Sequence, residues 1–274
     1  MNAPAPQVQR HLVRTPAGYV HLRTTGEPDP DRPSLLFLHQ VPASSRIWLP
    51  VMRGLAPLHC VAPDSLNLGE SDSTPAPLDL GEQADLLWSA AQEVSPGPKV
   101  VVGHHTGAAL AALIAARNAA EVRGLGLIGY PHYPSWQAKF AKFERLNPVQ
   151  TDPQGEGVAA VWRFIQRAFA TDADPDLVFD AFADRIRAGR IWYEGYVALF
   201  SSDLERIAVE ARDDSRPTLL VAPERDVLSA SADEVGALLG VEPVRTSGGA
   251  FVLTEDPPVV VAQVQALWQA VVRG

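Results

Sequence analysis

Short apolar runs separated by polar turns recur along the first 130 residues. Two segments alternate apolar and polar residues around a turn at 15–18, which predicts a β-hairpin over 7–14 and 18–24. Later runs are almost continuously apolar, which is typical of strands covered on both faces. These runs lie at 34–38, 58–63, 99–103 and 122–129. Segments with helical spacing of apolar residues separate them, at 47–55, 79–92 and 106–118. This alternation predicts an α/β protein with a mostly parallel sheet flanked by helices.

The alternation stops after residue 130 and resumes near residue 217. The intervening stretch, 131–216, has helical patterns, no clear strand and most of the aromatic residues. Beyond it the pattern predicts a strand, a helix, a short strand and a terminal helix, at 218–222, 231–239, 243–246 and from 257 onward. We therefore expect a core domain of residues 1–130 and 217–274, interrupted by a helical cap of residues 131–216.

Composition excludes several classes of partner. The chain has 274 residues, 46% of them hydrophobic, and a net charge of −9 without a cluster of Lys or Arg, so a nucleic-acid surface is not expected. No signal peptide and no membrane span are recognisable. The single cysteine, Cys60, lies in a predicted strand and is expected to be buried. These features favour a cytoplasmic protein that acts on a small molecule, as a monomer or a homodimer.

The most informative stretch is Gly103-His104-His105-Thr106-Gly107, between a buried strand and a helix that is apolar on nearly all sides. The pattern Gly-x-X-x-Gly at such a junction describes a nucleophile elbow, in which X lies on a strained turn above the sheet. The two glycines allow the strand and the helix to pack closely around that turn. X is normally Ser, sometimes Asp or Cys, but here it is His105.

Four motifs in the same order resemble the α/β-hydrolase superfamily, and within it the capped members related to haloalkane dehalogenases and C–C hydrolases. The resemblance covers essentially the whole chain. The motifs are the loops 38–48 and 63–72, the elbow 103–107, and the strand 219–226 with its following acid. It implies an eight-stranded sheet, an oxyanion hole made by the N–H groups of Val41 and Thr106, and Asp226 as the catalytic acid.

The chain departs from the family's pattern at three positions. Gln40 replaces the usual glycine of the first loop, His105 replaces the nucleophile, and Ala250 stands where the family has its catalytic histidine. Two of the three triad members are therefore missing. An ordinary serine-hydrolase mechanism is not supported.

We expect the imidazole to have moved rather than vanished. His105 reaches farther than Ser from the same position, and Ala250 leaves space where a ring would stand, so His105 is predicted to hydrogen-bond Asp226. The helix that begins after the elbow disfavours an imidazolium, and a neutral imidazole is a competent general base. Direct attack by His105 is less favoured, because nothing visible would then activate water.

Several other residues are candidates for binding substrate: His39, Gln40, His132, Tyr133, Trp136 and Trp192. For His39, a role in bracing the loop is favoured over contact with substrate. For His132, a place in the core or on the surface is favoured over a place in the binding cavity. His104 and His105 are expected to point apart, and the chain has neither a His-Glu-x-x-His motif nor a pair of cysteines, so no metal site is expected. The string Gly-x-Gly-x-x-Gly at 124–129 lies inside a strand instead of opening a helix, so no dinucleotide cofactor is expected.

The sequence thus favours a cofactor-free hydrolase of a small apolar carbonyl compound, such as an ester, a lactone or a carbon–carbon bond next to a carbonyl, with His105 as the base. Two alternatives stay open. One is a non-hydrolytic enzyme of the lyase or decarboxylase type that uses the same base. The other is a catalytically silent ligand-binding protein on the same fold.

Overall fold

A computed structural model describes residues 7–133, 153–169, 173–189 and 192–274, and an eight-stranded sheet is its centre. The strand order is β1-β2-β4-β3-β5-β6-β7-β8. β1 and β2 form the predicted antiparallel hairpin, β2 pairs antiparallel with β4, and the other neighbours are parallel. The strands are β1 (Gln9–Thr15), β2 (Gly18–Thr25), β3 (Ser34–Leu38), β4 (Cys60–Pro63), β5 (Lys99–His104), β6 (Val122–Ile128), β7 (Thr218–Pro223) and β8 (Val244–Thr246). The predicted α/β sheet is confirmed.

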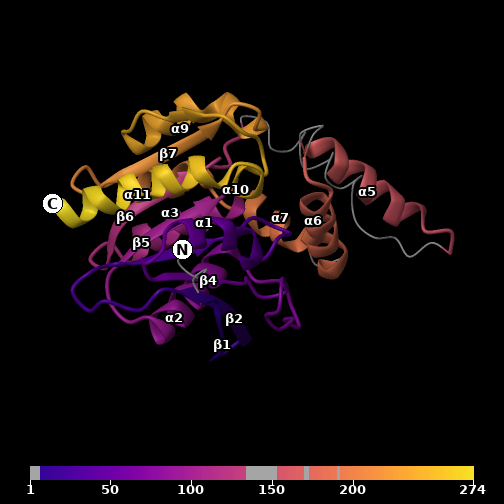
Figure 1. The fold of residues 1–274 in the computed structure, drawn as a ribbon, viewed down its shortest axis with the longest axis horizontal. Helices are drawn as coiled ribbons and strands as arrows, with labels where there is room; N and C mark the ends of the chain where they lie inside the picture. The colour runs from indigo at the N-terminus through magenta and orange to yellow at the C-terminus, as the bar shows by residue number, and fades with distance from the viewer. Residues whose placement is uncertain (1–6, 134–152, 170–172, 190–191) are drawn as a thin grey trace, which may run out of the picture.

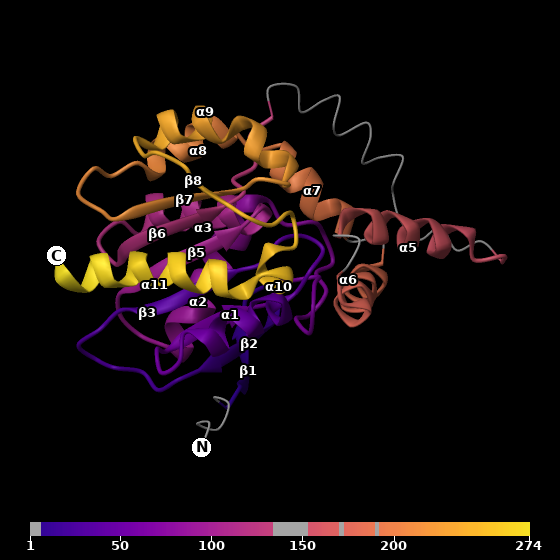
Figure 2. The ribbon, with the colours of Figure 1, turned by 45° about the horizontal axis from the view of Figure 1, so that its top comes forward.

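Helices cover both faces of this sheet (Figures 1 and 2). On one face pack α2 (Leu80–Val94), α3 (Thr106–Arg117), α8 (Leu204–Ala211) and α9 (Ala232–Leu239). On the other pack α1 (Leu49–Gly54), α10 (Val252–Glu255) and α11 (Pro257–Arg273). Short 3-10 turns, η1 (Ser45–Trp48) and η2 (Val227–Ser231), precede α1 and α9.

Side chains of each central strand divide between two apolar clusters. In β3, Leu36 and Leu38 join the cluster that contains α2 and α3, whereas Leu35 and Phe37 join the cluster that contains α1 and α11. This division follows from the period of two along a strand. All five residues of β3 are buried, which explains why its sequence is continuously apolar instead of alternating.

Helices α5 (Glu156–Ala168) and α6 (Pro175–Ala188) project beyond one end of the sheet, and α7 (Trp192–Phe200) leads back toward the core (Figures 1 and 2). The two projecting helices share a small apolar cluster of their own, which includes Ile165 and Phe169. Phe169 stacks on Phe251 of the core domain, with ring centroids 3.9 Å apart. The cap therefore has a core of its own and an aromatic contact with the sheet domain.

Helix α8 requires a correction to the predicted cap boundary. It lies inside 131–216, but its buried residues Ile207, Ala208 and Ala211 belong to the same apolar cluster as α3. Its apolar face covers the sheet domain because α3 itself is buried on all sides and needs a neighbouring helix. Within the predicted cap range, α8 therefore packs as part of the sheet domain.

A capping box explains where α2 begins, and the predicted burial of Cys60 is confirmed. Asp79 and Glu82 form the reciprocal capping box that begins α2. Cys60 is fully buried in β4, and burial raises the pKa of its thiol to about 12. The thiol is therefore protonated and unreactive at neutral pH.

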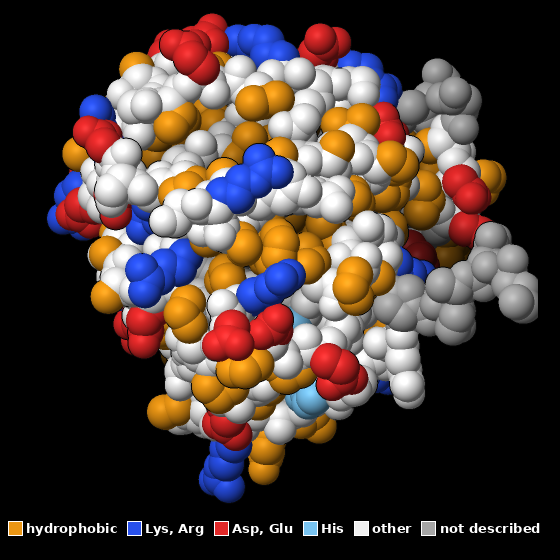
Figure 3. Space-filling view, turned by 60° about the vertical axis from the view of Figure 1, so that its left-hand side comes forward, with side chains coloured by type: hydrophobic (Ala, Val, Ile, Leu, Met, Phe, Trp, Pro, Cys, Tyr) orange, Lys and Arg blue, Asp and Glu red, His pale blue; other side chains and the backbone are white. Residues whose placement is uncertain are grey.

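The face of the molecule shown in Figure 3 carries acidic and basic side chains interspersed with apolar ones, and no patch of a single charge. Among the described residues, the helices are too short or too polar to cross a membrane.

Candidate active site

The turn between β5 and α3 has the strained backbone of an elbow. His105 has φ 50° and ψ −115°, one of two positive-φ non-glycine residues among those described. Its N–H donates to the carbonyl of Ile128 at 3.0 Å, and its carbonyl accepts from the N–H of Ala108 at 2.8 Å, so the surrounding hydrogen bonds hold the turn. Such strain persists where neighbouring structure over-determines the conformation.

The two glycines of the elbow are required by close packing. A Cβ on Gly103 would lie 2.0 Å from the carbonyl oxygen of Gly107, and a Cβ on Gly107 would lie 2.1 Å from that of Leu38. No side chain fits at either position without moving the backbone. The reason expected for these glycines, close approach of strand and helix, is confirmed.

The side chain of His105 points to the carboxylate that follows β7. Its Nε2 lies 2.5 Å from Oδ2 of Asp226, so a half-buried imidazole is hydrogen-bonded to a buried carboxylate. The other oxygen, Oδ1, accepts from the N–H of Leu228 at 3.0 Å. The predicted contact between the elbow imidazole and Asp226 is therefore present in the structure.

Room for this contact is made by Gly129, which follows β6 and has φ +58°. A Cβ on Gly129 would lie 2.7 Å from Cδ2 of His105 and 3.0 Å from Oδ2 of Asp226. The imidazole and the carboxylate therefore meet directly over a residue without a side chain. The sequence pattern predicts this space at Ala250 and gives no signal at Gly129.

The charge of the pair follows from its surroundings. Burial would raise the pKa of Asp226, but the charge and hydrogen bond of His105, with the N–H of Leu228, hold this pKa below its usual value. Asp226 is therefore an acceptor only, and Nε2 of His105 must carry the proton between them. Nδ1 is then the ring nitrogen with a free lone pair, and no hydrogen bond to it is formed within the described part of the chain.

His104 does not point away from His105, so that expectation is wrong. The two ring centroids are 4.2 Å apart with a tilt of 35°. The positive φ of His105 turns its ring back beside the last residue of β5, which an ordinary strand alternation would not do. His104 is fully buried, and burial together with the nearby His105 lowers its pKa well below the usual value. His104 is therefore neutral at pH 7.

The two predicted oxyanion donors follow adjacent strands. Val41 lies in the loop after β3, and Thr106 is the first residue of α3, directly after the elbow. Because β3 and β5 are parallel neighbours, both loops leave the same edge of the sheet. The carbonyl of Val41 accepts a 2.9 Å hydrogen bond from the hydroxyl of Tyr196 in α7, a contact that the sequence did not reveal.

His39 braces the loop that contains Val41. Its Nδ1 bonds the carbonyl of Gln40 at 2.9 Å, and its Nε2 accepts from the N–H of Ser65 at 2.9 Å. Both ring nitrogens are therefore used within the protein, and the side chain is buried. The bracing role that the sequence favoured fits these contacts, and the predicted contact of His39 with substrate has no free nitrogen to make it.

The remaining candidates lie in different surroundings. Nε2 of His132 lies 3.1 Å from Oε1 of Glu205 in α8, and its Nδ1 lies 3.3 Å from Oε2 of Glu234 in α9. His132 therefore connects the segment after β6 to both helices. The Tyr133 ring lies 5.6 Å from that of Phe200, and burial, with Tyr196 and Asp226 nearby, raises its pKa. Trp136 and the side chain of Trp192 lie outside the described residues.

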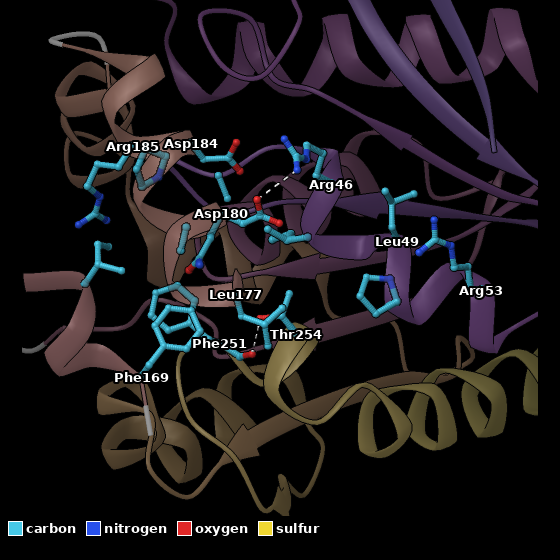
Figure 4. A pocket seen from close by; sticks show the side chains of 17 residues that line it. Arg46, Leu49, Arg53, Phe169, Leu177, Asp180, Asp184, Arg185, Phe251 and Thr254 are labelled. Atoms are coloured by element: carbon cyan, nitrogen blue, oxygen red, sulfur yellow. Dashed lines mark hydrogen bonds and ion pairs between the residues drawn. The ribbon is translucent and has the colours of Figure 1, made fainter. Parts of the chain in front are cut away.

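A pocket of about 280 Å³ lies between the core domain and the cap (Figure 4). Its walls are mostly apolar, with Phe169 and Phe251 on one side and charged residues of η1 and α6 on another. Gln40 lines it, whereas His105 and Asp226 do not. The pocket therefore does not include the His105–Asp226 pair.

Asp184 of the cap faces this pocket and touches the core. Its carboxylate accepts from the hydroxyl of Ser44 at 3.1 Å, and burial raises its pKa to about 6. One turn earlier on α6, Asp180 pairs with Arg46 at 3.3 Å (Figure 4). These polar contacts between domains lie in a segment where the sequence showed only a helical pattern.

The parallel sheet, the strained elbow after β5 and the acid after β7 define an α/β-hydrolase fold. The model of the α/β hydrolase fold family matches residues 33–222 of this chain. The chain therefore belongs to the α/β-hydrolase family.

Among sequence relatives, a haloalkane dehalogenase of Bradyrhizobium diazoefficiens is 29% identical over 166 residues, which are 59% of this chain and 51% of that protein. A second haloalkane dehalogenase, from Mesorhizobium japonicum, is 30% identical over 123 residues, which are 44% of this chain and 37% of that protein. The matches thus span about half or less of these curated relatives. The enol-lactonase of Burkholderia xenovorans LB400 superposes with a TM-score of 0.79 at 15% identity, over 94% of this chain and all of the other.

Proposed function

We propose that this protein is a cofactor-free enzyme that hydrolyses a small, apolar carbonyl compound, an ester, a lactone or a carbon–carbon bond next to a carbonyl, with His105 as general base. The observation that carries this proposal is the 2.5 Å hydrogen bond from His105 Nε2 to Asp226 Oδ2. It orients the ring and fixes which nitrogen holds the proton. A histidine left behind by a decayed site would not need a buried acid to orient it.

In the proposed reaction, Nδ1 of His105 takes a proton from water as the water attacks the carbonyl carbon. The imidazolium that forms is stabilised by the carboxylate of Asp226, as in the usual triad. The N–H groups of Val41 and Thr106 receive the developing oxyanion. The proton on Nδ1 then passes to the leaving group. No acyl-enzyme is formed, because no serine, cysteine or aspartate stands on the elbow.

Nδ1 is the ring nitrogen nearer to the backbone of its own residue. The base therefore lies closer to the neighbouring N–H of Thr106 than it would if Nε2 were the free nitrogen. This arrangement favours a small substrate whose carbonyl is held beside the elbow. Binding of the substrate by Gln40, Tyr133, Trp136 and Trp192 is part of the same proposal.

Fold and family support a hydrolase, and the enol-lactonase among the structural neighbours supports a carbonyl substrate as the first class to test. The activity of the haloalkane dehalogenases is not transferred to this chain. An alkyl halide has no carbonyl oxygen for an oxyanion hole, and the elbow has an imidazole in place of the usual nucleophile.

The test is a panel of small esters, lactones and β-diketones, assayed with the wild type and with His105→Ala. We expect turnover of one class in the wild type and a loss of about 10²–10⁴-fold in His105→Ala, the usual contribution of a general base. His11→Ala, on β1 at the edge of the sheet, is the matched histidine control and should retain activity. Full activity of His105→Ala would contradict the proposal.

A second pair of substitutions separates the proposed mechanism from serine-type catalysis. His105→Ser combined with Ala250→His restores both missing members of the family's triad. Ester hydrolysis that appears only in this double variant, with burst kinetics, would show that the wild type does not act as a serine hydrolase. The same kinetics in the wild type would overturn the assignment of His105 as a base.

Proton abstraction from carbon, without hydrolysis, is a second candidate that rests on the same geometry. A base with a free Nδ1, two backbone donors and no nucleophile on the elbow suits the formation of an enolate. Exchange of a substrate C–H for deuterium in D₂O, without cleavage, would favour this candidate. Tight binding of a ligand with neither exchange nor cleavage would favour the silent binding protein.

A further inference from the structure

Two imidazoles and a carboxylate meet at the elbow. His104, His105 and Asp226 each offer one ligand atom, and these three atoms all lie within 4.8 Å of one another. Two histidines with one carboxylate are a donor set that zinc and other divalent first-row transition metals accept. The sequence predicts no metal site partly because the two rings are expected to diverge, and that premise is wrong.

His104 supplies an independent observation. Its side chain is 1% exposed, yet neither ring nitrogen has a hydrogen-bond partner among the described residues. A buried polar group without a partner costs about 1–3 kcal/mol. The other buried histidine of this region, His39, uses both of its nitrogens. His104 is thus a neutral, buried imidazole with an unused lone pair beside His105 and Asp226.

From these two observations we infer that His104, His105 and Asp226 form a binding site for a divalent transition-metal ion, with Zn²⁺ as the best fit. The inference goes beyond the proposed function and does not depend on it. The bound ion would accept one imidazole nitrogen from each histidine and one oxygen from Asp226. A water molecule would complete a four-coordinate site.

The site needs only small movements to close around an ion. Zinc holds nitrogen and oxygen ligands at about 2.0–2.2 Å, which places neighbouring ligand atoms of a tetrahedron about 3.3–3.5 Å apart. The atoms of His105 and Asp226, now 2.5 Å apart, would separate by less than about 1 Å, and His104 would approach by roughly 1.5 Å at most. Gly129, which has no side chain, leaves the space beside both atoms.

Access for the ion is available through His105. Its side chain is 18% exposed, whereas those of His104 and Asp226 are buried. The ion would therefore enter over the elbow, where the proposed substrate also binds. A bound ion would take the place of the proton between Nε2 of His105 and Asp226. The remaining ring proton would then lie on Nδ1, which could no longer act as the base, so the ion would inhibit the proposed activity.

The test uses the full chain, treated with a chelator and free of any histidine tag, titrated with ZnSO₄ in a calorimeter. We expect one tight site per chain. His104→Ala, His105→Ala and Asp226→Asn should each weaken binding by at least about tenfold, since loss even of an outer partner of a metal ligand costs 10–100-fold. Absence of binding in the wild type overturns the inference.

His132→Ala is the matched control. His132 also has two carboxylates nearby, but Glu205 faces its Nε2 and Glu234 faces its Nδ1. The two carboxylates therefore do not meet at one ring nitrogen, where a single ion could bind both. Loss of zinc binding in His132→Ala, with binding kept in His104→Ala, would place the ion there and overturn the inference. The visible spectrum of the Co²⁺ form gives a second measurement, since a four-coordinate site absorbs far more strongly than a six-coordinate one.

His104→Gln keeps a polar side chain of similar size and covers the case in which His104→Ala fails to fold. It should fold and lose the tight site. Failure of this inference and failure of the proposed function are distinguishable, because binding is read without substrate and activity is read in the presence of chelator.

Discussion

Nε2 of His105 lies 2.5 Å from Oδ2 of Asp226, although 121 residues separate the two in the chain. The sheet brings them together, since β6 is the parallel neighbour of both β5 and β7 and each residue follows the end of its strand. In the usual triad a histidine from the last loop bridges nucleophile and acid. Here the imidazole stands on the elbow itself and reaches the acid directly.

Asp226→Asn should lower kcat by about 10²-fold or more, because an amide can present its N–H to the ring and select the wrong tautomer. The pKa of Asp226 is held low by His105, so activity in the wild type should not depend on its protonation at neutral pH. Steady-state kinetics with a substrate found in the proposed panel measures the effect. Asp256→Asn, a half-buried acid directly before α11, is the control and should change neither kcat nor KM.

Gly129→Ala should separate the imidazole from the carboxylate, because the new Cβ would lie 2.7 Å from Cδ2 of His105. We expect kcat to fall by about tenfold or more, together with changed NMR signals of the His105 ring. Gly189→Ala is a matched control, since Gly189 has the same φ of +58° but no atom within 4 Å of the added Cβ.

Both of these glycine variants incur the backbone strain of a positive φ, about 1–2 kcal/mol. Only Gly129→Ala adds the collision with the catalytic pair. If the two variants lose the same stability and the His105 ring signals stay those of the wild type in both, Gly129 has no positioning role. Chemical denaturation gives the free energies of unfolding for this comparison.

Tyr196→Phe removes the 2.9 Å hydrogen bond from the tyrosine hydroxyl to the carbonyl of Val41. The loss of one such bond costs about 1 kcal/mol, or about a fivefold effect, and should loosen the loop that carries one proposed oxyanion donor. We expect this effect mainly in kcat, because the loop would then hold the transition state less well. Tyr19→Phe, on the exposed part of β2, should leave kcat unchanged.

Asp184→Asn should stabilise the protein at neutral pH. Burial raises the pKa of Asp184 from 3.8 to about 6, so the folded state holds a proton that the unfolded state releases between these values. Stability from this group is therefore fully present below about pH 4 and is lost as the pH rises toward 6. Because the Asp184 side chain is partly exposed, solvent screens part of this effect. We expect the free energy of unfolding of Asp184→Asn to exceed that of the wild type by about 1 kcal/mol at pH 7.

The measurement for Asp184→Asn is thermal unfolding at several pH values between 4 and 8. The variant and the wild type should converge at the acid end and separate as the pH rises. Asp176→Asn, in the exposed first turn of α6, should follow the wild-type pH dependence. A constant offset between Asp184→Asn and the wild type at every pH would contradict the proposed titration.

Local patterns in the sequence determined most of the fold. The continuous apolar runs identify buried parallel strands because both faces of each strand are covered, as β3 shows. The capping box at Asp79 and Glu82 marks the start of α2 through two short-range hydrogen bonds. The pair of glycines around His105 identifies the elbow, since nothing else fits against Gly107 and Leu38. All of these signals depend on residues close together in the chain.

Only the tertiary structure decided how the site is assembled. Three of its features are contacts between segments far apart in sequence. Gly129 leaves room for the pair of His105 and Asp226, the hydroxyl of Tyr196 bonds the carbonyl of Val41, and α8 packs on the core domain. The position of His104 beside His105 depends on a single positive φ, which reverses the alternation that a strand would predict. Side-chain periodicity contains no such information, because it describes one element at a time, whereas the site lies where several elements end.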